Sequence, residues 1–334
     1  MSGTSQLARA MAGMGAGTVA RAWRRARRAP GRAIVLMYHR VADEADYLGM
    51  TVAPEVFVRQ LRVLRRRAHV VPLAALVARL GEGAPLRDDL AAVTFDDGYR
   101  DNLDVALPLL RAEGVPATVF VSTEFIDGTR RPAGERLRAA CEALWRERTA
   151  PATWTGESSV DVRIRALLAS PGSLDAVAQL RQALKALAHD GEDVMRRLES
   201  MAAGAAPARC SMLDWDGVRA LARGGVEIGS HAVSHGILAR MPIEQAEHEI
   251  RASKGRLESE LGRQVQGFAF PNGRRGDFLP EHLAALRQAG YGYACTAETG
   301  ANLPGCDAFQ LRRIGVGNDS DGLLDLKLAL GRAA

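Results

Sequence analysis

Apolar runs alternate with amphipathic segments along the chain from residue 33 onward. A run without polar residues, such as AIVLMY at residues 33–38, is typical of a strand that is buried on both faces. Similar runs predict further strands at residues 90–95, 117–122, 226–229, 265–270, 293–296 and 309–314. Apolar positions with helical spacing predict intervening helices at residues 54–66, 101–114, 213–225 and 242–262.

This alternation predicts an α/β protein with a parallel sheet that helices cover. Seven or eight such units suit a (β/α) barrel. In barrels and in open α/β sheets alike, functional groups gather at the carboxyl ends of the strands. The residues that directly follow each predicted strand are therefore the first candidates for a site.

One long segment, residues 127–210, interrupts the alternation. It is rich in Ala, Arg and Glu, contains no convincing strand, and is flanked by the loop-like stretches DGTRRPAGE and AAGAAPAR. We therefore expect a barrel over residues 33–334 with an inserted helical subdomain at about 127–210.

The composition is that of a soluble globular protein, with 47% hydrophobic and 25% charged residues. No apolar run reaches the roughly 18 residues of a membrane span. The first residues lack the basic start and sustained apolar core of a secretory signal. A cytoplasmic protein is therefore expected. Cys141, Cys210, Cys295 and Cys306 lie far apart and are interpreted as incidental thiols.

Positive charge is concentrated near the start of the chain. The net charge is +5, and residues 21–32 hold six arginines and no acid. Residues 1–32 are interpreted as a flexible, solvated arm, and the alternative is a surface that binds anionic lipid and gives peripheral membrane association. The basic residues form no recognisable nucleic-acid-reading motif, so no nucleic-acid partner is predicted.

Carboxylates and imidazoles follow two of the predicted strands. Asp96 and Asp97 follow residues 90–95 in TFDDGY, and His231 and His235 follow residues 226–229 in GSHAVSH. Each motif alone also fits a capped turn or structural histidines. Together, two neutral imidazoles and one carboxylate form a three-ligand metal site with open positions, and the second carboxylate remains as a general base. The spacing serves a metal provided that Asp97 reaches the histidines.

Two other strand ends carry weaker candidates. Tyr38 and His39 end the first strand, and Pro271, Asn272 and Gly273 follow residues 265–270 in FAFPNG. A turn alone explains Pro and Gly, and His39 fits a structural histidine equally well. Otherwise these residues face the same mouth, with Tyr38 and the Pro271–Asn272–Gly273 turn in contact with the substrate.

A specific family resemblance joins these motifs. TFDDGY, PATVFVS, GSHAVSH and FAFPNG, in this order, resemble the polysaccharide deacetylase superfamily (NodB-type, carbohydrate esterase family four), and LMYHRV resembles a subset with an extra leading strand. The resemblance implies a deformed (β/α) barrel of about seven parallel strands that removes N-acetyl groups from amino sugars with one divalent metal ion. It assigns Asp96 as the general base and Asp97, His231 and His235 as metal ligands. Zinc is the expected ion, with cobalt, nickel or manganese as alternatives.

The sequence departs from the family pattern at two places. Ala269 stands where the family usually has an arginine that orients the base, and the tail FQLRRIGVGND lacks the histidine that supplies the general acid in many members. Arg312 or Arg313 is the expected replacement for the orienting charge. His39 is the expected general acid.

The predicted function is therefore an N-deacetylase or deformylase that acts on an amino sugar in a polysaccharide or a lipid-linked glycan precursor. The alternatives are a glycan-binding relative without turnover and a mononuclear iron oxygenase, since two histidines and a carboxylate also suit Fe(II). The insertion is expected beside the mouth of the barrel. Trp145 and Trp154 would form a sugar-facing wall there or, as the favoured reading, pack within the insertion.

Overall fold

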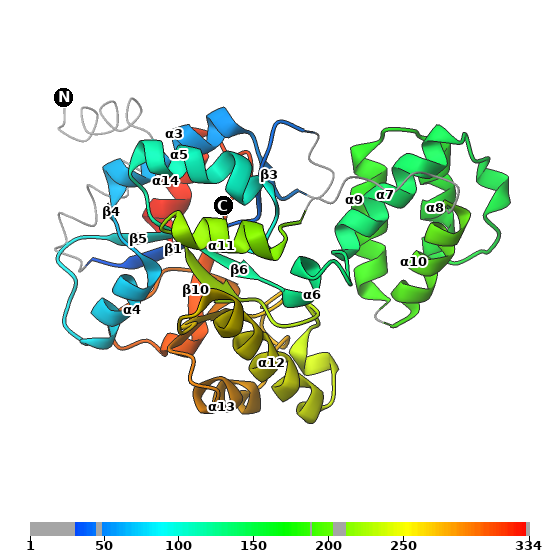
Figure 1. Cartoon of the computed structure of the whole chain (residues 1–334). Helices are drawn as coiled ribbons and strands as arrows, with labels where there is room; N and C mark the ends of the chain where they lie inside the picture. The colour runs from blue at the N-terminus through cyan, green and yellow to red at the C-terminus, as the bar shows by residue number, and fades with distance from the viewer. Residues whose placement is uncertain (1–30, 45–48, 188, 203–211, 332–334) are drawn as a thin grey trace, which may run out of the picture. The chain divides into compact units, whose positions relative to one another are not determined.

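The computed structural model describes residues 31–44, 49–187, 189–202 and 212–331 (Figure 1). Cys210 and residues 1–30 of the predicted basic arm lie outside these ranges. Two compact units make up the chain, and each is described by itself. The first contains Met1–Asp43, Val52–Thr129 and Met212–Ala334, and the second contains Glu44–Thr51 and Arg130–Ser211.

Seven parallel strands of the first unit form a closed barrel. Their order is β1-β10-β9-β8-β7-β6-β5, and pairing of β1 with β5 closes the ring. A further short strand, β4, pairs with the start of β5. The predicted (β/α) barrel of about seven strands is confirmed. The barrel strands are β1 (Ala33–Tyr38), β5 (Leu90–Phe95), β6 (Ala117–Val121), β7 (Glu227–Ser230), β8 (Gly267–Ala269), β9 (Tyr293–Thr299) and β10 (Leu311–Gly315), and the short strands are β2 (Arg40–Val41), β3 (Thr51–Val52) and β4 (His69–Val70).

Alternate residues of each barrel strand face opposite sides, as the period of two requires. In β5, Val93 and Phe95 belong to the large core between the strands and the helices. Ala92 belongs to a second cluster inside the barrel, together with Phe120 and Cys295. The next inward positions toward the carboxyl end of β5 are Thr94 and Asp96, both buried. The barrel interior therefore changes from apolar to polar toward its carboxyl end.

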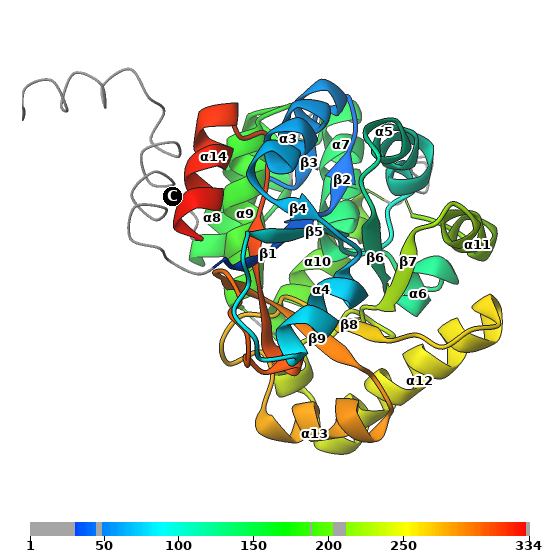
Figure 2. The ribbon, with the colours of Figure 1, turned by 90° about the vertical axis from the view of Figure 1, so that its left-hand side faces the viewer.

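Amphipathic helices surround this barrel and bury their apolar stripes against it (Figures 1 and 2). Phe57 and Leu61 of α3, for example, are fully buried in the outer core. The helices of the first unit are α3 (Pro54–Arg67), α4 (Leu73–Gly81), α5 (Leu107–Glu113), α6 (Thr123–Ile126), α11 (Trp215–Arg223), α12 (Ile243–Leu261), α13 (Pro280–Gln288) and α14 (Asp321–Leu330).

The structure shifts several predicted boundaries; β9 (Tyr293–Thr299), for example, extends three residues beyond the predicted 293–296. The helix expected over residues 101–114 begins as a π-helical segment, Asn102–Ala106, because Leu107 donates to the Asn102 carbonyl and Pro108 has no N–H to continue an α-helical pattern. The strand expected over residues 265–270 has only the three residues of β8. The strand expected from residue 309 begins at Leu311, because Ala308–Gln310 form a 3₁₀ turn that the Asp307 side chain caps.

The second unit is helical and has a core of its own. Trp154 is buried, donates its indole N–H to Asp161 over 2.7 Å, and has the Arg197 guanidinium 4.0 Å from its ring centre. Trp145 donates to the Leu167 carbonyl over 2.9 Å. Both tryptophans therefore pack within their own unit, as the favoured reading has it. The elements are α7 (Ala133–Arg146), a 3₁₀ turn at Pro151–Thr153, α8 (Ser159–Ala169), α9 (Leu174–Ala186) and α10 (His189–Met201).

No helix within the described ranges is long and apolar enough to cross a membrane. Cys141 and Cys295 are buried free thiols, and Cys306 is a half-buried one. Burial raises the pKa of Cys295 to about 12, so this thiol stays protonated and unreactive.

Candidate active site

Asp97, His231 and His235 come together at the carboxyl ends of β5 and β7. One potential ligand atom from each lies within 4.8 Å of the others. Nε2 of His235 is 3.2 Å and Nε2 of His231 is 3.6 Å from the same carboxylate oxygen, Asp97 Oδ1. The condition that the sequence left open, that Asp97 must reach the histidines, is met.

The backbone of these loops adopts conformations that non-glycine residues rarely take. Asp97, Ala232 and His235 have φ values of 75°, 67° and 58°. Each left-handed residue of this kind costs on the order of 1–3 kcal/mol and persists only where its surroundings hold it. With this left-handed turn, the Asp97 carboxylate lies against the two histidines. Gly98 continues the turn at φ 86°, where a Cβ would lie only 2.9 Å from Val121.

The donor set fits a divalent cation. Asp97 Oδ1 is buried and has no hydrogen bond, although two imidazole nitrogens face it. His231 donates from Nδ1 to the Ala269 carbonyl over 2.7 Å, which leaves Nε2 as the lone-pair nitrogen. Burial lowers the pKa of His231 to about 4 and keeps the ring neutral. Burial raises the pKa of Asp97, but the surrounding histidines outweigh this effect and lower it, so the carboxylate is ionised. A buried carboxylate oxygen that has no hydrogen bond and faces two imidazole nitrogens is what a Zn²⁺-type site requires.

Asp96 faces the barrel interior and is held by an arginine from another strand. Arg313 of β10 donates to both oxygens of Asp96, over 2.7 Å from Nη1 and 2.8 Å from Nη2. Its Nε donates to the Thr296 carbonyl over 2.8 Å, and its side chain is fully buried. Burial raises the pKa of Asp96, but the Arg313 guanidinium outweighs it and lowers the pKa. Asp96 is therefore an oriented, ionised carboxylate.

Of the two arginines expected to replace the missing orienting charge, only Arg313 reaches the site. Arg312 is exposed on the opposite face of β10. Strand alternation distinguishes them, because Leu311 and Arg313 share the inward face. At the place of the family's usual arginine, Ala269 offers its backbone carbonyl to His231 instead.

His39 lies at the same rim as Asp96, whereas Tyr38 does not face the mouth. Tyr38 pairs in register with Phe95, so His39 and Asp96 follow their strands at the same rim, and the His39 side chain is half-buried there. Asn102 fixes the His39 backbone by donating to its carbonyl over 2.9 Å. Tyr38 is fully buried, stacks on Phe95 and donates its hydroxyl to Gln60, so we correct its predicted role from substrate contact to core residue.

The turn after β8 lies beside His231 through the Ala269 contact. Pro271 and Gly273 are buried, and Asn272 is half-buried with φ 59°. The Asn272 amide donates to Asp277 over 2.6 Å, which holds the turn. His235 is the most open of the clustered side chains at 33% exposure, against 7% for Asp97 and 2% for His231. The cluster is therefore reached from the His235 side.

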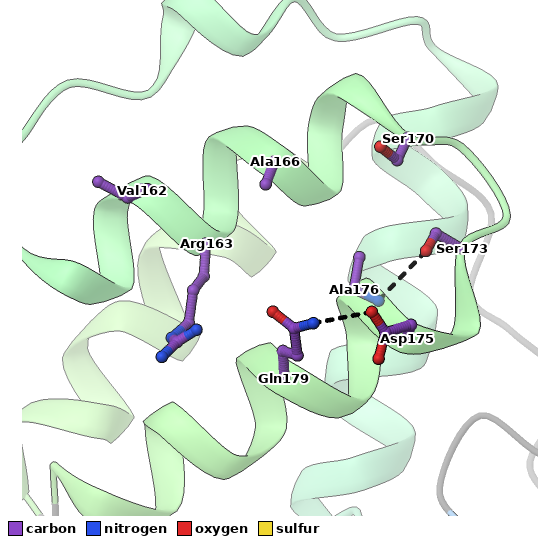
Figure 3. A pocket seen from close by; sticks show the side chains of 8 residues that line it. All are labelled: Val162, Arg163, Ala166, Ser170, Ser173, Asp175, Ala176 and Gln179. Carbon is purple, nitrogen blue, oxygen red and sulfur yellow. Dashed lines mark hydrogen bonds between the residues drawn. The ribbon is translucent and has the colours of Figure 1, made fainter.

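A separate hollow of about 290 Å³ lies between α8 and α9 in the second unit (Figure 3). The polar groups around it serve the helix itself. Gln179 donates to Asp175 over 2.7 Å, and the Ser173 hydroxyl caps α9 by accepting from the Ala176 N–H over 3.2 Å (Figure 3). These contacts give no reason to place a ligand there.

A closed parallel barrel with carboxylates and imidazoles gathered at its carboxyl end defines a (β/α)-barrel enzyme. Residues 83–294, more than half of the chain, match the family described as polysaccharide deacetylase, and the chain belongs to this family. It is accordingly a carbohydrate deacetylase, a hydrolase of amide bonds. No curated protein sequence matches the chain significantly.

Several solved structures share the fold at low sequence identity. The deacetylase PplD of Streptococcus pyogenes, solved in complex with acetate, is 15% identical with a TM-score of 0.59, covering 90% of this chain and 99% of its own. IcaB from Ammonifex degensii is 19% identical with a TM-score of 0.56, covering 90% and 97%. A de-N-acetylase from Aggregatibacter actinomycetemcomitans is 16% identical with a TM-score of 0.54, covering 86% and 96%.

Proposed function

We propose that this chain is a metal-dependent N-deacetylase, or deformylase, that hydrolyses the N-acyl group of an amino sugar in a polysaccharide or a lipid-linked glycan precursor. The observation that carries the proposal is the Asp97–His231–His235 cluster beside an Asp96 carboxylate that Arg313 orients. The names of similar structures support it, since one is a de-N-acetylase and another is a deacetylase in complex with acetate, the product of acetyl-amide hydrolysis.

Asp97, His231 and His235 would hold one divalent ion, with zinc expected first and cobalt, nickel or manganese as alternatives. When bound there, such an ion polarises the amide carbonyl and makes water a stronger nucleophile. His231 is prepared for this role by its bond to the Ala269 carbonyl, which presents Nε2.

Asp96 is the proposed general base. Its two oxygens are oriented by Arg313, and it is ionised, so it is ready to accept the proton of the attacking water. The arginine also lowers the basicity of Asp96, and we infer that its orienting role outweighs this effect. The turn at Pro271, Asn272 and Gly273 is the proposed substrate contact.

His39 is the proposed general acid. An amide nitrogen leaves poorly as an anion, so the departing amine requires a proton. His39 directly follows β1 at the same rim as Asp96, and an imidazole is a side chain that can donate a proton. Asn102 holds the His39 carbonyl, and the next residue, Arg40, forms an ion pair with Asp101 over 2.8 Å.

The test combines metal analysis with acetate release from acetylated chito-oligosaccharides. The wild-type protein should contain one divalent ion and release acetate. Asp96→Asn and His39→Gln should keep the ion but lose turnover by roughly 10²–10⁴-fold, because each removes a proton-transfer group and not a ligand. Asp97→Asn should lose affinity for the ion as well.

Asp88→Asn and His69→Gln are matched controls, since both side chains are 73% exposed, and they should behave as wild type. Identical metal titrations for Asp96→Asn and Asp97→Asn would contradict the division of roles. Metal and glycan binding without turnover would indicate a binding protein, and oxygen uptake would indicate an iron oxygenase.

A further inference from the structure

A buried carboxylate on α12 holds the loop that carries both histidines. Glu249 is only 4% exposed. Its Oε2 accepts the backbone N–H groups of Val233 and Ser234, each over 2.8 Å, and its Oε1 accepts the Ser234 hydroxyl over 2.7 Å. These three donors all belong to the short stretch between His231 and His235.

No lysine or arginine of the described ranges forms an ion pair with Glu249, so the loop donors are what satisfy its buried oxygens. The three bonds therefore require acceptor oxygens at this position. A carboxylate is acceptor-only and takes all three bonds at once, which no apolar side chain at this position does. Removing it would leave two half-buried N–H groups without this acceptor, a cost of up to about 1–3 kcal/mol for each group.

The loop needs such a restraint because it is strained. Ala232 and His235, on either side of the bonded residues, both have positive φ. The Ala232 carbonyl accepts from Thr123 over 3.3 Å and the Val233 carbonyl from Glu124 over 3.0 Å, so α6 holds the carbonyl side of the loop while Glu249 holds the N–H side. Without Glu249, the strained turns lose the bonds that over-determine them.

We propose that Glu249 is a positioning residue for the metal centre, which fixes the turns between His231 and His235 so that both imidazoles face Asp97. The inference rests on the proposed function in one respect, that these imidazoles bind a divalent ion. It adds a residue outside the ligand set and outside the proton-transfer groups.

The decisive comparison is Glu249→Met against Glu249→Gln. Methionine keeps the length of the side chain but accepts none of the three bonds. Glutamine keeps an oxygen for the two N–H groups, while its amide can donate to a reoriented Ser234 hydroxyl. Loss of a partner that orients a ligand typically weakens metal affinity by 10–100-fold, so Glu249→Met should raise the Zn²⁺ dissociation constant by roughly that factor and Glu249→Gln by less than about threefold.

The readouts are chelator-competition titration with Zn²⁺, the absorption spectrum of the Co²⁺-loaded protein, and thermal unfolding. Glu244→Met, at an exposed position on the same helix, is the matched control and should leave the affinity and the spectrum unchanged. If Glu249→Met does not fold, Ser234→Ala carries the test, because it removes one of the three bonds and should weaken binding several-fold.

Wild-type affinity and an unchanged Co²⁺ spectrum in folded Glu249→Met would overturn the proposal, as would an equal loss in Glu249→Gln. Absence of metal binding by the wild-type protein would instead overturn the proposed function, and this inference with it. The two failures are therefore distinguishable.

Discussion

Asp96 and Asp97 are adjacent in the chain, yet their surroundings give them different chemistry. Arg313 occupies both oxygens of Asp96, whereas Oδ1 of Asp97 is buried without a hydrogen bond. The separation arises from the backbone, because Asp96 continues the inward face of β5 and the positive φ of Asp97 turns the next side chain out of the strand alternation. Two identical side chains are thereby suited to the two proposed roles of an oriented base and a metal ligand.

The two bonds from Arg313 to Asp96 predict that turnover depends on the geometry of this pair and not on its charge alone. In Arg313→Lys the positive charge remains, but an ammonium group does not hold both carboxylate oxygens in one plane as a guanidinium does. Turnover should fall by about 10²-fold, comparable to the loss of a positioned proton-transfer group, while Zn²⁺ affinity stays unchanged. Steady-state kinetics and metal titration of the same preparation check this.

Lysine is chosen because Arg313→Ala would leave a buried carboxylate without its partner, which typically destabilises a protein by about 3–5 kcal/mol. Arg312→Lys, one residue away on the exposed face of β10, is the control and should be neutral. Wild-type turnover in folded Arg313→Lys would show that Asp96 needs only a nearby charge.

At the scale of single elements, the alternation of residues along each strand already predicts which side chains face the barrel interior. The alternation that places Ala92, Thr94 and Asp96 inward also places Tyr38 outward with Leu36 in the helix-facing core. This signal separates Arg313 from Arg312 and argues against Tyr38 as a substrate contact. Sequence spacing does not, however, reveal which strand supplies the partner of Asp96, because that pairing spans 217 residues.

Other features depend on contacts that no local pattern encodes. Glu249 looks like an ordinary polar residue of an amphipathic helix, and only the packing of α12 against the loop shows that its carboxylate is buried. The π-helical start of the helix before α5 follows from Pro108, a local signal, but its exact hydrogen bonding does not. The barrel was predictable from apolar alternation, whereas partner choice at its rim required the tertiary structure.

Gly229 of β7 and Gly255 of α12 lie in opposite packing environments, so alanine at the two positions should change the stability in opposite directions. Gly229 of β7 faces Phe120 so closely that a Cβ would lie 2.4 Å from the ring, while Gly255 in α12 is exposed and has open space around it. Gly229→Ala should overpack the barrel interior and destabilise the protein by about 1–3 kcal/mol. Gly255→Ala should stabilise it by about 0.5–1 kcal/mol, because alanine loses less backbone entropy in a helix.

Urea unfolding of both variants measures the difference. The two substitutions are chemically identical, so opposite signs would isolate the effect of the packing environment. If the Gly229→Ala variant is as stable as the wild-type protein, Phe120 has room to move. The barrel interior would then be less tightly packed than the contact between Gly229 and Phe120 indicates.

At the scale of the whole molecule, the two units have separate cores. The hydrophobic cluster of the second unit draws only on residues between Leu137 and Ala202, and the two clusters of the barrel draw on none of them. The groups of the proposed site, including Arg313 and Glu249, all belong to the first unit. Asp127 also belongs there, since it accepts the Trp215 indole N–H over 2.7 Å and pairs with Arg256 over 3.0 Å.

Replacing residues 130–211 by a short linker should therefore leave the metal site intact and alter how the substrate binds. The cut preserves the Asp127 contacts and removes only a segment with its own core, so Zn²⁺ affinity should match that of the full chain.

The segment follows α6, which itself follows the carboxyl end of β6, so we expect it to affect the recognition of long glycans. KM should rise several-fold for long acetylated oligosaccharides and less for short ones, with kcat little changed. Kinetics against oligosaccharide length, beside metal titration, provide the measurement. If KM is unchanged at every length, the insertion is a spacer, and if metal affinity falls, the site depends on the second unit in a way that its separate core does not predict.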